Sequence, residues 1–92
     1  MSVYLVSYDL NKPGQDYTPL YEELKKASSW WHYLDSTWLI SSAQPLETWQ
    51  QRIKSKIDIN DSFLIVEFSP AKPYGGWLPQ KAWDWIRGHL IS

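Results

Sequence analysis

Residues 29–40 read SWWHYLDSTWLI, and the organisation of the whole chain depends on how this stretch divides. Most of its residues are aromatic or apolar types that strands favour, whereas Asp35 and Ser36 in the middle are turn formers. We therefore predict two short strands within residues 28–43, joined by a tight turn or a bulge. One long bent strand is the alternative.

The chain before this stretch predicts one strand and one helix. Residues 3–8 are a β-branched and aromatic run that ends at the turn-forming residues 9–14, DLNKPG. Thr18 then provides an N-cap, and Pro19 a first-turn proline, for a helix that extends to about Ala27. A strand, a loop and a helix are expected in this order.

The chain after the stretch predicts a helix, a strand and a last helix. The first of these helices begins at Pro45 and carries apolar residues at helical spacing. Residues 62–68, SFLIVEF, are another strand, and residues 69–76 form a loop because they hold two prolines and two glycines. Pro79 then opens a short C-terminal helix.

These elements predict an α+β fold in the order β-α-β-β-α-β, the split βαβ or ferredoxin-like arrangement, with an extra C-terminal helix. A chain of 92 residues has room for one domain. We therefore assign residues 1–92 to a single ferredoxin-like domain, with a core over about residues 3–68 and a C-terminal loop and helix over residues 69–92.

Charge and cysteine content limit the classes of function. Nine Lys and Arg against ten Asp and Glu give a formal charge of -1, without the broad basic field of non-specific nucleic-acid binders, so any nucleic-acid contact must be local. The chain has no cysteine, which excludes a disulfide framework and a thiolate metal site. Because residues 1–9 contain neither a basic start nor a long apolar run, we expect no signal peptide, no membrane association and a cytoplasmic location.

The first and last strands predict a partner. In the expected fold both crossover helices cover one face of the sheet, so the strands should alternate apolar and polar residues. Residues 3–8 and 63–68 instead carry apolar residues on both faces. Either the C-terminal helix or a second copy of the chain must cover the other face. We predict a homodimer through the open sheet face or its edge, with Trp83 and Trp85 in the contact.

Asp9 is the first candidate for chemistry. It ends the first strand, before a glycine-containing loop, where a carboxylate can hold a divalent cation such as Mg²⁺. In a twofold dimer, two copies of Asp9 could share the ion. The structural alternative is that Asp9 caps the loop through an Asx-type hydrogen bond. Asn11 and Lys12 follow in the same loop and are candidate binding residues.

Asp35 and Ser36 are further candidates for binding, and turn chemistry also explains both. His32 has no second histidine at zinc-binding spacing, so we expect its ring to pack beside Trp31 or Tyr33. The sequence contains no Ser/His/Asp set, phosphate-cradling glycine loop or redox motif. No established catalytic motif is therefore recognised.

Adjacent Trp30 and Trp31 must point to opposite faces of a strand, so only one of them enters the helix-covered core. Core filling is the default role of tryptophan in a domain of this size. The other ring needs a dimer partner, the C-terminal tail or a ligand such as a stacked base. We take Trp31 as a candidate binding residue.

Three segments carry a resemblance to a known family. Residues 8–9, a tyrosine-aspartate pair, close the first strand; residues 36–38, STW, follow the central turn; and residues 58–62, DINDS, form an acidic turn before the last core strand. This order and spacing resembles that of the small CRISPR-associated proteins that form the central dimer of the spacer-acquisition complex. The resemblance covers about residues 3–68.

The resemblance implies a ferredoxin-like homodimer, with Asp9 at the position of the metal-dependent nuclease activity that is reported for some family members. The chain also departs from that family. Members usually carry basic residues that bind DNA or RNA along the dimer, whereas this chain is slightly acidic and rich in tryptophan. Its residues 75–90, GGWLPQKAWDWIRGHL, have no counterpart there.

Two functions of different classes follow. The first is a nucleic-acid-associated homodimer, either a scaffold or a weak Mg²⁺-dependent endonuclease, supported by Lys12 near Asp9 and by the basic residues Arg52, Lys54 and Lys56. The second is a non-enzymatic protein-interaction module, an adaptor or inhibitor that grips another protein with exposed tryptophans. Small-ligand binding in a dimer cleft is a third alternative.

Overall fold

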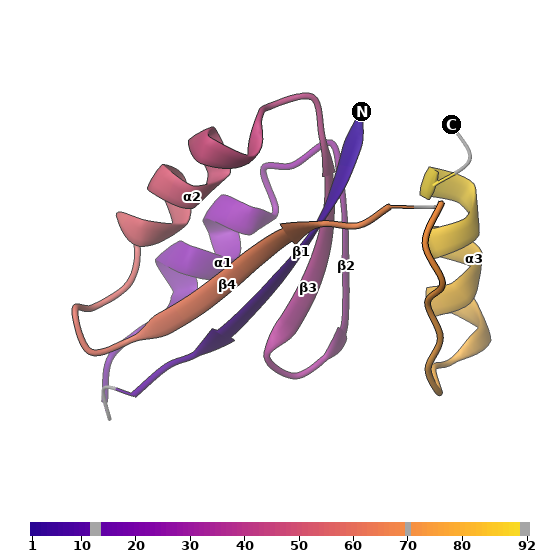
Figure 1. The fold of residues 1–92 in the computed structure, drawn as a ribbon. Helices are drawn as coiled ribbons and strands as arrows, with labels where there is room; N and C mark the ends of the chain where they lie inside the picture. The colour runs from indigo at the N-terminus through magenta and orange to yellow at the C-terminus, as the bar shows by residue number, and fades with distance from the viewer. Residues whose placement is uncertain (12–13, 70, 91–92) are drawn as a thin grey trace.

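The computed structural model describes residues 1–11, 14–69 and 71–90. Within these ranges the chain forms strands and helices in an α+β arrangement, which confirms the predicted class (Figure 1). In chain order the elements are β1 (Ser2–Asp9), α1 (Thr18–Leu24), β2 (Ser29–Leu34), β3 (Thr37–Ser42), α2 (Leu46–Lys54), β4 (Ser62–Glu67) and α3 (Gln80–Leu90).

The stretch SWWHYLDSTWLI forms the predicted pair of strands. β2 and β3 pair antiparallel around a tight turn, so the single bent strand is wrong. Trp31 pairs with Leu39, and Leu34 pairs with Thr37. Between these two pairs β2 has one residue more than β3, which makes a β-bulge. The hairpin therefore contains both a turn and a bulge.

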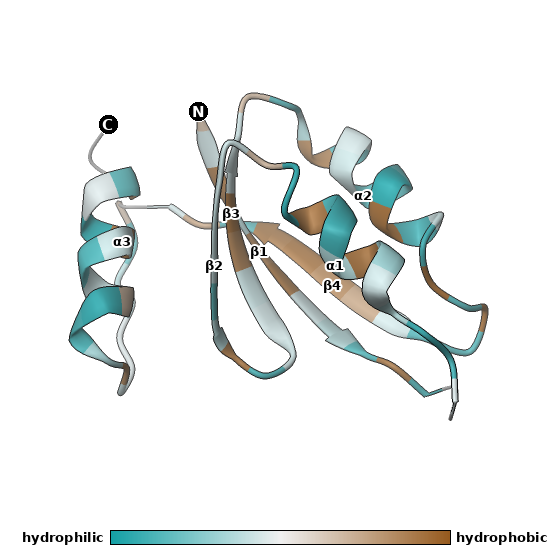
Figure 2. Cartoon of the chain, turned by 180° about the vertical axis from the view of Figure 1, so that it is seen from behind, coloured by the Kyte–Doolittle hydropathy of each residue, from teal (hydrophilic) through white to brown (hydrophobic). Residues whose placement is uncertain are grey.

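The strands make one antiparallel sheet in the spatial order β2-β3-β1-β4, with β2 and β4 at its edges. α1 and α2 cover one face of the sheet, and α3 lies against the other, so the molecule is layered (Figures 1 and 2). Because successive strand residues point to opposite faces, each face builds its own apolar core.

The first core fills the space between the sheet and the pair α1 and α2. Two tryptophans, one from a central strand and one from α2, are its largest fully buried side chains. Its members with 0–1% exposure are Val6, Leu20, Leu24, Trp38, Ile40, Trp49 and Ile53. Large aromatic side chains give this small domain a substantial apolar core.

The second core lies between the sheet and α3. The strands contribute Val3, Trp31 and Leu39, and α3 contributes Ala82 and Ile86. The indole N–H of Trp31 donates a hydrogen bond to the carbonyl oxygen of Ala82 at 3.2 Å. The C-terminal helix therefore covers this part of the sheet, which is the first of the two predicted alternatives.

The start and end of α1 differ from the prediction. Tyr17 holds the N-cap position, without a capping hydrogen bond from its side chain, and Thr18 is the first helical residue. The carboxylate of Asp16 accepts a hydrogen bond from the backbone N–H of Thr18 at 3.0 Å, so a cap from the threonine hydroxyl is not needed. The helix ends at Leu24, before the predicted end at Ala27.

None of the helices in the described ranges has both the length and the apolar composition that crossing a membrane requires.

Candidate functional site

The helix α3 leaves one side of its sheet face uncovered. Directly opposed residues of antiparallel strands share a face, and one such row runs through Trp31, Leu39, Leu5 and Val66. Trp31 and Leu39 are 3% exposed, Leu5 is half-buried and Val66 is 41% exposed. Leu64, on the same face of β4, is 61% exposed. We name Leu64 and Val66 the open strip.

The same strand presents an unpaired edge, since β4 pairs with β1 alone in the described sheet. Natural proteins commonly blunt an edge strand with lysine, proline or a bulge. β4 reads SFLIVE, without lysine or proline, and its register with β1 runs without a shift. Figure 2 shows β4 in brown along most of its length. The opposite edge strand, β2, does carry a bulge, so β4 is the edge that is open to pairing.

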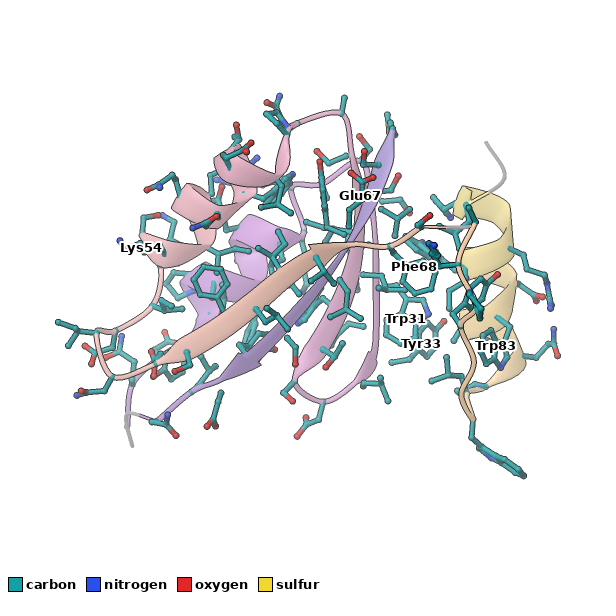
Figure 3. All side chains as sticks on the ribbon, viewed as in Figure 1. Trp31, Tyr33, Lys54, Glu67, Phe68 and Trp83 are labelled. Carbon is teal, nitrogen blue, oxygen red and sulfur yellow. The ribbon has the colours of Figure 1, made fainter. Side chains whose placement is uncertain are left out.

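An apolar pocket of about 130 Å³ lies between the sheet, α3 and the loop that precedes α3. Its aromatic walls are Trp31, Phe68, Tyr74 and Trp83. Figure 3 shows Trp31, Phe68 and Trp83 between the sheet and the helix. Most of the remaining lining is aliphatic, and Thr37 contributes a hydroxyl group. None of the described residues in the lining carries a charge, so the pocket suits an uncharged ring.

Trp30 and Trp31 point to opposite faces, as predicted. Trp31 is the ring that avoids α1 and α2, and α3 covers it. Trp30 is 42% exposed on the other face. Its ring centroid lies 5.4 Å from that of Trp38, and the ammonium group of Lys25 lies 5.4 Å from its ring. The ring of this pair that solvent reaches is therefore Trp30. The candidate binding residue Trp31 is 3% exposed and forms part of the wall of the apolar pocket.

His32 stacks on Trp38, so the expected packing beside Trp31 or Tyr33 is wrong. The His32 and Trp38 ring centroids are 4.0 Å apart, with 14° between the ring planes. The antiparallel register that pairs Trp31 with Leu39 places His32 beside Trp38 on the neighbouring strand. The indole N–H of Trp38 donates to the hydroxyl of Tyr8 at 2.9 Å, and burial raises the pKa of that phenol. His32 thus completes an aromatic stack.

Asp9 and the turn at Asp35 and Ser36 lie at the same end of the sheet. The backbone N–H of Tyr8 donates to the carbonyl oxygen of Ser36 at 3.1 Å, which holds the turn beside the end of β1. Asp9 is exposed and pairs in register with Ser62 of β4. In the described part of the chain, no three His, Cys, Asp or Glu side chains are grouped so that they could hold a metal ion. Mg²⁺ at Asp9 would need water, phosphate or a second chain for its remaining ligands.

Asn11 belongs to a structural link that the sequence did not reveal. Its backbone N–H donates to Oδ1 of Asp61 at 2.7 Å, and the hydroxyl of Tyr17 donates to the same oxygen at 2.7 Å. The backbone N–H of Asp58 donates to Oδ2 of Asp61 at 2.7 Å. Asp61 therefore ties the loop after β1 to the turn before β4. The other candidate in that loop, Lys12, lies outside the described residues.

One of the three basic residues at the end of α2 is used inside the molecule. The Nε of Arg52 donates to Oε2 of Glu23 at 2.6 Å, and its guanidinium lies 3.9 Å from the ring centroid of Trp49. Lys54 and Lys56 are exposed. The basic patch expected here is thus reduced to two lysines.

Comparison with protein-family models, with curated proteins and with solved structures finds no match to this chain. The residues of the chain itself are therefore the basis for assigning a function.

Proposed function

We propose that this protein is a homodimeric protein-interaction module with a ferredoxin-like fold, which associates through β4. The observation that carries the proposal is that one strand combines an unblunted edge with the exposed Leu64 and Val66. Exposed apolar side chains beside a free strand edge are typical of strands that pair with another chain. The strand order β2-β3-β1-β4 and the helices between strands support the ferredoxin-like assignment.

Antiparallel pairing of β4 with the β4 of a second copy is self-complementary about a twofold axis. It joins the two sheets into one and gives the outward backbone groups of both edges hydrogen-bond partners. The open strips of the two copies become cross-strand neighbours, which shields the edge-facing sides of Leu64 and Val66 from water. This partial burial contributes less than the about 1.5–3 kcal/mol of a completely buried side chain.

Light scattering at micromolar concentration tests this dimer. The wild type is expected at twice the chain mass of 10.9 kDa, and Leu64→Lys, which places a charge on the open strip, is expected at the monomer mass. Ile59→Lys is the matched control, because Ile59 is 96% exposed in the turn before β4. A monomeric wild type, or a dimer that Leu64→Lys leaves intact, contradicts the proposal.

A second candidate function, association with nucleic acid, is favoured by the surface around Trp30. This half-exposed ring has Lys25 over it and the exposed His32 nearby on the same face of β2. Proteins that bind single-stranded nucleic acid commonly combine an aromatic ring, on which a base stacks, with a nearby cation that contacts a phosphate. The contact is local, as the formal charge of -1 requires.

Fluorescence anisotropy with labelled single-stranded RNA and DNA at low salt tests this second function. Trp30→Ala and Lys25→Ala are each expected to weaken binding, because they remove the stacking ring and the cation. Lys54→Ala is the matched control, since Lys54 is an exposed lysine on α2. The proposed nucleic-acid association is contradicted if the wild type does not bind either nucleic acid. It is also contradicted if Lys54→Ala weakens binding as much as Trp30→Ala and Lys25→Ala do.

The nuclease form of this second candidate assigns Mg²⁺ to Asp9. Asp9 would hold the ion, which would supply an activated water and neutralise charge on a phosphate. Antiparallel β4 pairing does not bring two Asp9 residues together, because Asp9 lies opposite Ser62 at one end of β4 and the twofold axis carries the second Asp9 to the far end. The β4 dimer therefore excludes a metal site that two copies of Asp9 share.

Asp9→Asn tests the nuclease form directly. If Asp9 is catalytic, the variant loses the Mg²⁺-dependent cleavage of labelled RNA or DNA that the wild type shows. Equal cleavage in both samples identifies a contaminating nuclease and removes this form of the proposal.

A further inference from the structure

Trp77 is a large apolar side chain that the described chain leaves in water. It is 100% exposed, although Gly75 and Leu78 on either side of it line the apolar pocket. Tyr74 of the same loop lines the pocket as well. Trp77 therefore belongs to a loop that lines the pocket, but its indole does not line the pocket itself. Tryptophan is also the residue type most enriched among the energetic hot spots of protein interfaces.

The pocket has the size and chemistry of an aromatic site. Its volume of about 130 Å³ is close to the roughly 150 Å³ of an apolar cavity that binds benzene, so it has room for the six-membered ring of an indole. Trp31, Phe68 and Trp83 offer ring faces and edges to an incoming ring. A buried indole also needs an acceptor for its N–H, and Thr37 supplies a hydroxyl oxygen in the lining.

We propose that the indole of Trp77 from a second copy of the chain occupies this pocket, and that the insertion is reciprocal. The inference rests on the proposed homodimer and names the residue that anchors it. A chain that carries both a protruding ring and a pocket of matching chemistry is self-complementary. In a twofold dimer, the indole of each copy can therefore enter the pocket of the other. Within one chain, the loop turns Trp77 away from its own pocket.

The loop before α3, which carries Trp77, lies where an interface formed by β4 would continue. In both views the loop before α3 lies on the β4 side of that helix (Figures 1 and 2). Leu5, which neighbours Val66 of the open strip across the strands, also lines the pocket. The pocket and the open strip are therefore parts of one surface.

The buried area fits such an interface. A tryptophan buries about 150–250 Å². The indoles of two reciprocal insertions therefore supply roughly a quarter of the about 1,600 Å² of a standard interface, and the pocket walls and the open strips extend it. Gly75 and Gly76 precede Trp77, and a Cβ at Gly76 would meet only the Trp83 ring at 4.0 Å, so this backbone has room to adjust its direction.

Trp77→Ala is the direct test, measured as the dimer dissociation constant by sedimentation at several concentrations. Because Trp77 is fully exposed, the substitution leaves the fold of one chain intact, which far-UV circular dichroism verifies. We expect the dissociation constant to rise at least about tenfold, as for an interface hot spot. Ile59→Ala, an equally exposed apolar residue far from the pocket in sequence, is expected to change nothing.

A mixture of two variants tests reciprocity. Leu34 lines the pocket and is 46% exposed, so Leu34→Asp places a charge at its mouth and is expected to weaken the dimer as Trp77→Ala does. Trp77→Ala keeps an intact pocket and Leu34→Asp keeps an intact indole. A mixture of the two variants can therefore make one insertion, and it is expected to associate more tightly than either variant alone.

The outcomes separate this inference from the β4 dimer. In one outcome, Leu64→Lys breaks the dimer but Trp77→Ala leaves its affinity at the wild-type value. That outcome supports the β4 dimer and overturns the insertion of Trp77. A mixture that associates no more tightly than its separate components also overturns it. A monomeric wild type contradicts both.

Discussion

Glu23 is a buried carboxylate whose charge is balanced from two sides. Its residue is 7% exposed, and its oxygens accept hydrogen bonds from Arg52 at 2.6 Å and from Lys26 at 3.1 Å. Burial acts to raise the pKa of this carboxyl group, but the hydrogen bonds and charges of Arg52 and Lys26 outweigh it, so the pKa lies below its usual value of 4.5. The pair links α1 to α2 across the top of the first core.

The lowered pKa of Glu23 gives stability a defined pH dependence. The ionised carboxylate stabilises the fold above the unfolded value of 4.5, and this contribution is lost as pH falls through the lower folded value. We expect Glu23→Gln to cost about 1.5 kcal/mol at pH 7, and the difference from the wild type to shrink below pH 4.5. Urea unfolding at pH 7, 5 and 3 measures it.

Glu22→Gln is the control for this pH series, because Glu22 is the exposed neighbour on the same helix. It is expected to follow the wild type at every pH. A Glu23→Gln effect of the same size at pH 3 and pH 7 would show that the charge of Glu23 does not stabilise the fold.

Trp38 and Trp49 are matched in burial but not in hydrogen bonding. They are 1% and 0% exposed. Trp38 donates to Tyr8, whereas the indole N–H of Trp49 is buried without a hydrogen-bond partner among the residues that the structure describes. Trp38→Phe leaves the Tyr8 hydroxyl without its donor, so we expect it to destabilise the protein by about 1 kcal/mol more than Trp49→Phe. Thermal unfolding compares the two variants, and equal losses would refute the assigned role of the hydrogen bond.

α3 is held to the sheet by a narrow apolar side and by two indole hydrogen bonds. Ala82 and Ile86 are its buried residues, and Trp85 donates to the Ser29 hydroxyl at 2.9 Å while Trp31 donates to the Ala82 carbonyl. The helix therefore covers the second core with few residues. Each of these residues contributes to holding α3 on the sheet.

Ile86→Ala is expected to destabilise the protein by about 2–4 kcal/mol, because it empties a site that is 3% exposed between α3 and the sheet. Arg87→Ala is the control on the same helix. Arg87 pairs with Asp84 at 3.1 Å with both side chains largely exposed, so its loss is expected to stay within about 0.5 kcal/mol. Urea unfolding of both variants checks this, and similar losses would mean that α3 does not depend on its apolar side.

The molecule as a whole is asymmetric, because two helices cover one face of its sheet and one helix covers part of the other (Figure 1). The uncovered part runs along β4 to the pocket. A partner bound there through apolar contacts stabilises the folded state by mass action. The same contacts carry little charge, so salt has little effect on them.

This arrangement predicts that the melting temperature rises with protein concentration, and that 0.5 M NaCl changes the dimer dissociation constant by less than about twofold. Scanning calorimetry over a hundredfold concentration range and sedimentation at two salt concentrations measure the two effects. Binding of single-stranded nucleic acid at Lys25 and Trp30 would instead weaken with salt. A melting temperature independent of concentration contradicts the dimer.

The order of helices and strands was predictable because the signals for it are local. Strand-forming residues, the turn at Asp35 and Ser36, and prolines at helix starts act over a few residues each. The opposite directions of Trp30 and Trp31 follow from strand alternation alone. The sequence thus determined the α+β class, the hairpin and the fact that one of these two rings needs a cover other than α1 and α2.

Only the tertiary structure decided what provides that cover and what stays exposed. Trp31 meets Ala82, 51 positions along the chain, and Asn11 meets Asp61, 50 positions along it. Contacts between residues so far apart in the sequence depend on how whole helices and strands dock. Local sequence patterns do not carry this information. The docking of α3 over β2 and β3 leaves β4 uncovered, because a single helix is too narrow to cover a four-stranded sheet.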